Sequence, residues 1–454
     1  MIKKKKKKKI ITICYSDAGN GPLSASKSVE NTLRILDPDS SIIEVSLIDV
    51  LKQTSGAGYM MVRLYNYLLK KNLFWNTLAL RMFYKSDLIK SGSLLKYSTK
   101  HLTAIFERKM PSVVVFTNPW IIGFTLSAIK KLPISRRPKT VSLVIDIGLK
   151  HLPPAWYQKD IDLFIVATQE AREQLVSSGA DEHKILVLGM PLHPDLLSVQ
   201  EMFDKDPKGK DYYRCVECKD IPHVLVMGGR AGTRNTLTIV QGLIKLGDVL
   251  PLHLTVLCGQ NMELRHKMMM LMTKAYASVS SIEEKHAIVD KSLPSSKDSV
   301  QPKRVHLMIE GFVPDVLPYM KAADLLITKP GALTVSEAAV LNLPMVLDVD
   351  PTIMGQEIGN VEYVRAKGIG MIASKVSDIP KLVQRFFIDK QFKDDILKNM
   401  RSARELDGTM AIAEAILEDC EGWKKRKTGS SEITSSTMQK YSEFLVSSGE
   451  DDIR

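Results

Sequence analysis

Short apolar runs alternate with amphipathic stretches along the first half of the chain. Apolar runs of this length predict buried strands, and stretches with a helical period between them predict helices. The predicted strands lie in IITICY (10–15), SIIEVSLIDV (41–50), SVVVFTNP (112–119), TVSLVIDI (140–147), DLFIVAT (162–168) and KILVLGMP (184–191). Strands that alternate with helices form parallel sheets with crossover connections, so the first half is predicted to be an α/β domain.

A polar, charge-rich stretch at 202–222 interrupts this rhythm, which then starts again. The second half carries apolar runs at 223–229, 252–259, 305–312, 324–331 and 343–349, with helices expected from about 236, near 262–275 and from about 335. Two similar α/β domains joined by a linker predict a ligand cleft between them, at the carboxyl ends of the strands.

Changes in composition set the expected domain boundaries. The expected segments are a basic tail at 1–9, a first domain at 10–205, a linker at 206–222, a second domain at 223–425 that contains a polar insertion at 278–304, and a polar tail at 426–454. The last helix of the second domain can pack back on the first.

The net charge of +12 comes largely from one place, because Lys3 to Lys9 supply seven of the charges. This distribution argues against a nucleic-acid partner, which would require a basic surface on the domains themselves. The lysine run is either attracted to anionic lipid headgroups or is a solvated tail. The sequence contains no uninterrupted apolar stretch of about 18 residues, so it predicts no transmembrane helix. The N-terminus lacks the apolar region of a signal peptide.

The five cysteines are scattered, and the CxxC formed by Cys215 and Cys218 has no second pair at zinc spacing. We interpret that pair as incidental to a linker. The odd number of cysteines and the lack of an export signal favour a reducing compartment.

The stretch ITKPGALTVSEAAVLNLP (327–344) carries the strongest candidate for an anion site. Gly331 has no Cβ, so the N–H groups of Ala332, Leu333 and Thr334 can approach an anion at the helix N-terminus, where the helix dipole also favours negative charge. Thr334 is predicted to cap this helix, with Glu337 at capping-box spacing. Alternatively, Glu337 points into the cleft and binds a ribose diol.

A second polar group follows about 20 residues later, in GQEIGNVEYV (355–364). Gln356, Glu357 and Asn360 have side chains suited to sugar hydroxyl groups. The pattern is weak alone and gains weight from its position after a phosphate-type turn.

The segment from EGFVPDVL (310–317) to GNVEYV (359–364) resembles the donor domain of the glycosyltransferases that include plant monogalactosyldiacylglycerol synthase and bacterial diacylglycerol glucosyltransferase. GALTVSE is also similar to the bacterial transferase that adds N-acetylglucosamine to the peptidoglycan precursor. In the first half, TNPW (117–120), DIGLKHLPPAWY (146–157) and ILVLGMPLHPDL (185–196) resemble blocks of the diacylglycerol enzymes. The resemblance extends from residue 10 to about 420.

This resemblance implies a GT-B fold, with two Rossmann-like domains whose parallel sheets face a cleft. The second domain would hold a UDP-hexose. The implied contacts are Gly311, Phe312 and Val313 with uracil, Glu337 with ribose, Gly331, Ala332, Leu333 and Thr334 with the diphosphate, Gln356, Glu357 and Asn360 with the hexose, and the turn containing Gly228, Gly229 and Arg230 with the phosphates. The resemblance implies no metal and no other cofactor.

Transfer to a lipid hydroxyl group with inversion needs a base that takes the proton of the acceptor. The family has a histidine in its first glycine loop, whereas the acceptor loop of this chain reads Gly19, Asn20, Gly21, Pro22, and proline cannot accept a proton. The remaining candidates are Asp17, Asp146 and His151. Asp17 could instead cap the loop, and His151 could be structural.

Aromatic, aliphatic and basic residues are mixed between 58 and 90, which suits helices lying on an anionic membrane or a helix packed on the sheet. The family resemblance favours the membrane. We therefore expect a peripheral membrane enzyme, on the cytoplasmic face or on a plastid envelope, that transfers galactose or glucose from a UDP-sugar to diacylglycerol. The alternatives are another lipid acceptor, or a catalytically impaired relative that binds UDP-sugar or membrane.

Overall fold

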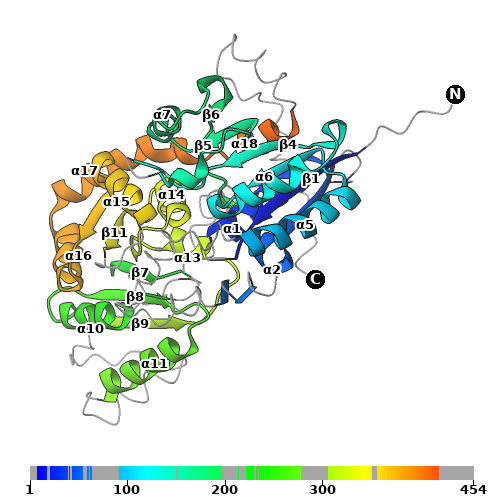
Figure 1. Ribbon diagram of the computed structural model, residues 1–454. Coiled ribbons are helices and arrows are strands. Elements are labelled where there is room, and N and C mark those ends of the chain that lie inside the picture. The colour runs from blue at the N-terminus through cyan, green and yellow to red at the C-terminus, as the bar shows by residue number, and fades with distance from the viewer. Residues whose placement is uncertain are drawn as a thin grey trace.

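The structure is a computed structural model with two α/β domains, coloured blue to green and green to orange in Figure 1. It describes residues 8–17, 21–38, 40, 43–54, 59–60, 62–63, 92–149, 152–196, 213, 221–229, 232–233, 235–277, 305–349 and 355–418.

The first domain is built on a six-stranded parallel sheet with the strand order β2-β1-β3-β4-β5-β6. Its strands are β1 (Lys9–Tyr15), β2 (Ile43–Asp49), β3 (Val113–Phe116), β4 (Lys139–Leu143), β5 (Leu163–Val166) and β6 (Ile185–Val187). Its helices are α1 (Gly21–Leu36), α2 (Val50–Thr54), α5 (Gly92–Lys109), α6 (Ile122–Lys130) and α7 (Gln169–Ser177).

The second domain repeats this architecture in the order β12-β11-β10-β7-β8-β9, again all parallel. Its strands are β7 (His223–Met227), β8 (Leu252–Leu257), β9 (Val305–Glu310), β10 (Leu325–Thr328), β11 (Met345–Asp348) and β12 (Gly370–Ala373). Its helices are α10 (Thr236–Leu246), α11 (Met262–Ala277), α13 (Leu317–Ala322), α14 (Ala332–Val340), α15 (Gly355–Lys367), α16 (Ile379–Ile388), α17 (Lys390–Met400) and α18 (Thr409–Leu417).

The central strands of both sheets are apolar and buried along their whole length, as in β3 (VVVF) and β10 (LLIT). A strand covered by helices on both faces needs continuous apolar sequence, and this is why the apolar runs predicted the strands. The prediction of two doubly wound α/β domains is therefore confirmed.

Two helices begin earlier than the sequence pattern predicts, which places their starts near residues 25 and 335. Helix α1 starts at Gly21, because the first turn of a helix tolerates Pro22, whose missing N–H would have no partner within the helix. Helix α14 starts at Ala332, with Gly331 as its N-cap and no side-chain cap. The capping box predicted for Thr334 and Glu337 is therefore wrong, since Thr334 is already the third residue of the helix.

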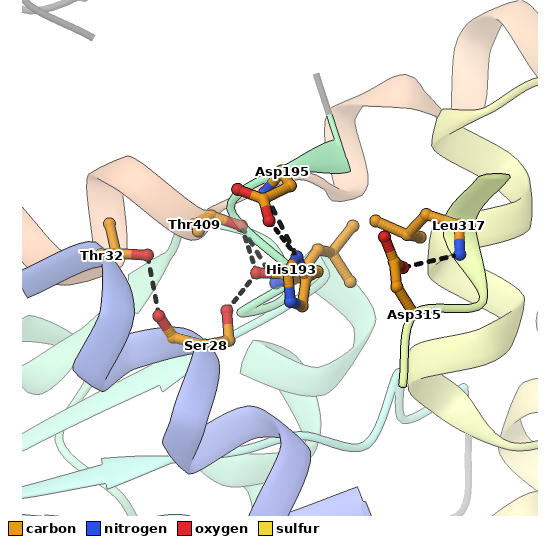
Figure 2. A network of polar contacts seen from close by, with 8 residues as sticks. Ser28, Thr32, His193, Asp195, Asp315, Leu317 and Thr409 are labelled. Atoms are coloured by element: carbon orange, nitrogen blue, oxygen red, sulfur yellow. Dashed lines mark hydrogen bonds and ion pairs between the residues drawn. The ribbon is translucent and has the colours of Figure 1, made fainter. Parts of the chain in front are cut away.

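The C-terminal part of the second domain returns to the first, where α18 contacts α1. Leu192, which follows β6, donates its backbone N–H to the Thr409 hydroxyl over 3.0 Å, and the same hydroxyl donates to the Leu192 carbonyl oxygen over 3.1 Å. The Ser28 hydroxyl of α1 also donates to that carbonyl oxygen (Figure 2). These bonds fasten the middle of α1 and the start of α18 to the chain that leaves the first sheet.

Several segments singled out in the sequence lie outside the described residues. They are the tail at 1–7, most of the segment at 58–90, nearly all of the linker, the insertion at 278–304 and the chain from 419 onward. Among the helices that the structure describes, none combines the length and the apolar character needed to cross a bilayer.

Candidate functional site

The turn from β10 to α14 presents the N-terminus of a helix at the carboxyl edge of the second sheet. Gly331 caps the helix in an extended conformation (φ −74°, ψ 131°). A Cβ built on Gly331 would meet only the Cε of Lys329, at 3.9 Å. The first N–H groups of a helix have no partner within the helix, so this open turn can accept an anion.

A second glycine turn follows β7, the strand next to β10. A Cβ on Gly228 would lie 2.2 Å from the backbone nitrogen of Thr233, so a side chain would break the turn. Gly229 and Gly232 have φ values of +73° and +69°, which favour glycine. Arg230 lies outside the described residues.

The Asn235 amide fastens the end of this turn to β11, which lies on the other side of β10. Its Nδ2 donates to both carboxylate oxygens of Asp348, over 3.1 and 3.0 Å. The two glycine turns, after β7 and after β10, are thus held side by side at one edge of the sheet.

Glu337 is the sixth residue of α14 and is half-buried. Burial of its carboxyl group and, to a lesser extent, the charge of Asp315 together raise its pKa from 4.5 to about 8. The Asp315 carboxylate itself accepts the backbone N–H of Leu317, at the start of α13, over 2.9 Å (Figure 2). A half-buried carboxyl group of this kind suits the hydrogen-bonding groups of a sugar.

The loop after β9 contains Gly311, Phe312 and Val313. Phe312 is exposed, whereas Val313 packs against the core. A Cβ on Gly311 would lie 3.4 Å from the Cδ of Arg265, a residue of α11. The loop thus offers backbone groups and an aromatic side chain at the same edge as the two turns.

Helix α15 brings the predicted sugar-binding residues to this edge. The Asn360 side chain is buried, and its amide donates to the Pro330 carbonyl oxygen over 2.8 Å, which ties α15 to the turn before α14. Glu357 accepts from the Lys329 ammonium group over 2.9 Å. Gln356 lies in the first turn of α15, and its side chain is not described. The hexose contacts of these three residues stay a prediction.

Asp146 approaches this group from the first domain, just beyond the end of β4. Its carboxylate accepts the indole N–H of Trp156 over 2.7 Å. The pKa of Asp146 is raised to about 6, because burial and, to a lesser extent, the charge of Glu357 in the second domain outweigh the lowering effect of the bond from Trp156. A Cβ on Gly359 of α15 would lie 3.3 Å from the backbone of Leu149, so the two domains meet directly here.

The other candidate bases are placed differently. The backbone N–H of Asp17 donates to the carboxylate of Asp49, at the end of the neighbouring strand β2. Gly21 and Pro22 form the first turn of α1, and the Pro22 carbonyl oxygen accepts the Ser26 hydroxyl over 2.8 Å. Gly19, Asn20 and His151 lie outside the described residues. The charge of Glu357 acts on Asp146, which relates this predicted base to the second domain.

Residues that the sequence did not single out complete the site. Lys329 and Asp315 sit beside predicted positions, and Trp156 holds Asp146. A lysine directly after a buried strand and two residues before Gly331 was the available signal for Lys329. Within the part of the chain that the structure describes, no group of His, Cys, Asp and Glu side chains is arranged to hold a metal ion.

Comparison with known proteins agrees with this architecture. Residues 23–192 match the family described as monogalactosyldiacylglycerol (MGDG) synthase, and residues 223–415 match the glycosyltransferase family 28 C-terminal domain.

Among the similar proteins are a processive diacylglycerol beta-glucosyltransferase of Bacillus pumilus and monogalactosyldiacylglycerol synthase 2 of Arabidopsis thaliana. The first is 24% identical over 92% of this chain and 97% of the relative. The second is 23% identical over 90% of this chain and 80% of the relative.

Among solved structures, MurG of Acinetobacter baumannii covers 90% of this chain and 99% of its own, with a TM-score of 0.52 and 14% identity. This likeness supports the two-domain fold. The two family matches, one for each domain, show that the chain belongs to the glycosyltransferases that join an MGDG synthase domain to a family 28 C-terminal domain.

Proposed function

We propose that this enzyme transfers a hexose from a UDP-sugar to diacylglycerol with inversion and makes a glycosyldiacylglycerol. The family supplies the class of reaction, and both relatives named above act on this lipid or form its galactosyl product. The observation that carries the proposal is the electrostatic interaction of Asp146 of the first domain with Glu357 of the second, whose partner Lys329 lies against the two glycine turns.

The donor is assigned to the second domain. The diphosphate lies against the N–H groups of Ala332, Leu333 and Thr334 and the turn of Gly228 and Gly229. The ribose reaches Glu337, and the uracil reaches the backbone of Gly311, Phe312 and Val313. Asn360 positions α15 through its bond to Pro330, while Gln356 and Glu357 meet the hexose. Backbone donors and a helix dipole stabilise the charge on the diphosphate as it leaves.

We assign Asp146 as the catalytic base, because Pro22, at the place of the family's histidine, cannot accept a proton. A base needs a pKa near the working pH, and the pKa of about 6 keeps most of the carboxylate ionised at neutral pH while it remains basic enough to take a proton. The indole of Trp156 fixes the orientation of the carboxylate. Asp146 accepts the proton of the acceptor hydroxyl as its oxygen attacks the anomeric carbon and UDP departs.

The acceptor and the membrane are assigned to the first domain. The aromatic and basic segment at 58–90 and the lysine run at 3–9 would contact anionic lipid, so the enzyme works as a peripheral membrane protein. We assign no nucleic-acid partner.

The test is an incubation of the purified full chain with diacylglycerol vesicles and labelled UDP-galactose or UDP-glucose. The expected product is a labelled glycolipid from one of the two donors, formed in larger amount on vesicles that contain anionic lipid. UDP binding without glycolipid from either donor would instead indicate the catalytically impaired relative, for which the proline at position 22 is the sequence feature.

A further inference from the structure

Lys329 lies between the two glycine turns of the second domain. Its Cε is 3.7 Å from the position of a Cβ on Gly229 and 3.9 Å from that of a Cβ on Gly331. One lysine side chain therefore spans the space that the two turns share. A Cβ at either glycine would be in ordinary van der Waals contact with this side chain.

The ammonium group of Lys329 is paired with Glu357, over 2.9 Å. The lysine side chain is 47% exposed, whereas the glutamate side chain is 15% exposed. An ion pair with so exposed a partner is screened by water and contributes little to the stability of the fold. Because Glu357 is largely buried, the exchange needs a ligand that gives the lysine another anion and gives the carboxylate new hydrogen-bond donors.

A diphosphate is the stronger partner for a lysine in this position. It carries more than one negative charge on several oxygens, and charge-assisted bonds to phosphate are among the strongest hydrogen bonds in proteins. The helix N-terminus beside Lys329 favours the same anion. Two independent features, the turns and the lysine, thus converge on one place.

We propose that the Lys329 ammonium group moves from Glu357 to the diphosphate when the nucleotide sugar binds, and that this exchange leaves Glu357 for the hexose hydroxyl groups. This inference rests on the proposed function and adds a donor-binding residue and an order of events to it. Without the nucleotide sugar, Lys329 is paired with Glu357. With it, Lys329 binds the diphosphate and Glu357 binds the hexose.

The exchange also serves the transfer step. The bond between the anomeric carbon and the diphosphate oxygen breaks, and its electron pair stays on UDP. The new bond joins the anomeric carbon to the acceptor oxygen, whose proton passes to Asp146. The ammonium group of Lys329 stabilises the negative charge that accumulates on the departing UDP.

The first experiment compares UDP with uridine by calorimetry on the full chain. We expect Lys329→Met to weaken UDP binding about tenfold or more and to change uridine binding by less than about twofold, because uridine has no phosphate. Lys329→Arg should retain most of the UDP affinity. Lys381→Met, at an exposed lysine on α16, is the matched control and should bind UDP like the wild type.

The second experiment tests the exchange with Glu357→Gln. This variant removes the competing carboxylate, so UDP should bind at least as tightly as to the wild type, while the added affinity of UDP-hexose over UDP is lost. A Glu357→Gln variant that loses UDP affinity as strongly as Lys329→Met would overturn the exchange.

Two further outcomes separate the failures. Suppose that the wild type binds UDP and that Lys329→Met binds UDP equally well, or loses affinity for uridine as strongly as for UDP. Lys329 then does not contact the diphosphate, and this inference is wrong. If the wild type does not bind UDP, the proposed function itself fails.

Discussion

Helices α1 and α14 both begin after a parallel strand at a glycine–proline pair, but the order of the two residues is reversed. In α1, Gly21 and Pro22 form the first turn, so one of the leading N–H groups is missing. In α14, Pro330 and Gly331 come before the helix, and the residues from Ala332 onward keep their N–H groups. The order of two residues thus decides which helix offers a full set of donors to an anion.

The charges near the starts of the two helices also favour an anion at α14 over one at α1. Lys329 adds a positive charge beside α14, whereas Asp17 and Asp49 lie near the start of α1. We infer a division of labour in which the second domain binds the charged donor and the first supplies the acceptor side and the base. Four changes to the chain test this division, besides those at Lys329 and Glu357.

The largest expected effect is that of Asp146→Asn. Loss of a general base lowers the rate by about 10²- to 10⁴-fold, so kcat should fall by this factor. The Kd for UDP should stay within about twofold, because Asp146 belongs to the other domain. Steady-state glycolipid formation and calorimetry measure the two quantities.

Asp17→Asn is the matched control, and it should keep most of the activity. In the wild type, kcat should fall as the pH falls through about 6, because protonation of Asp146 removes the base. Equal losses in both variants, or a full rate at pH 5, would contradict the assignment of Asp146.

The next effect distinguishes the two glycines. Gly331→Ala should weaken UDP binding about tenfold, because the methyl group stands where the phosphate approaches the helix. Gly21→Ala adds a methyl group in similarly open space, 3.9 Å from the Cδ1 of Ile145, and should leave the UDP affinity unchanged. Calorimetry with UDP on both variants gives the answer, and the opposite ranking would assign the anion to α1.

A smaller effect is expected from Glu337→Gln. The pKa of Glu337 is raised from 4.5 to about 8, so the fold favours the protonated form. Its contribution to stability is present below pH 4.5 and is lost as the pH rises toward 8. Between pH 5 and 8 the Tm of the wild type should therefore fall by roughly 5 °C more than that of Glu337→Gln, which has no such proton.

The Glu337→Gln measurement is thermal unfolding of the full chain followed by circular dichroism. Glu362 lies on α15 in a solvent-accessible ion pair with Arg365, so Glu362→Gln is a control that should follow the wild type. Parallel curves for the wild type and Glu337→Gln would show that burial does not hold the proton on Glu337.

The smallest effect is expected from Pro22→Ala. The change restores one N–H in the first turn of α1. It also removes the restriction that proline imposes on the unfolded chain, which lowers the free energy of unfolding by about 0.4–1 kcal/mol. UDP affinity and kcat should both stay within about twofold. A large change in UDP affinity would show that α1 takes part in donor binding.

Much of the fold could be predicted because its signals are local. The strands are short and largely apolar, and β1 to β11 lie within the runs recognised in the sequence or begin at most one residue before them. Strand β12 was missed, since GMIA is short and begins with glycine. The starts of α1 and α14 were displaced because a helix N-terminus depends on backbone angles at one residue, and those angles are not visible in the pattern.

Part of the candidate site could likewise be predicted from local sequence, and part could not. The sequence alone determined that the polar residues after β9 and β10, the glycine turn after β7 and Asp146 all stand at carboxyl ends of parallel strands. Only the tertiary structure decided that Lys329 spans two turns, that Asn360 is buried against Pro330, and that Asp146 feels the charge of Glu357. Strand formation depends on a few neighbouring residues, whereas these distances and the raised pKa of Asp146 depend on how two domains, far apart along the chain, pack together.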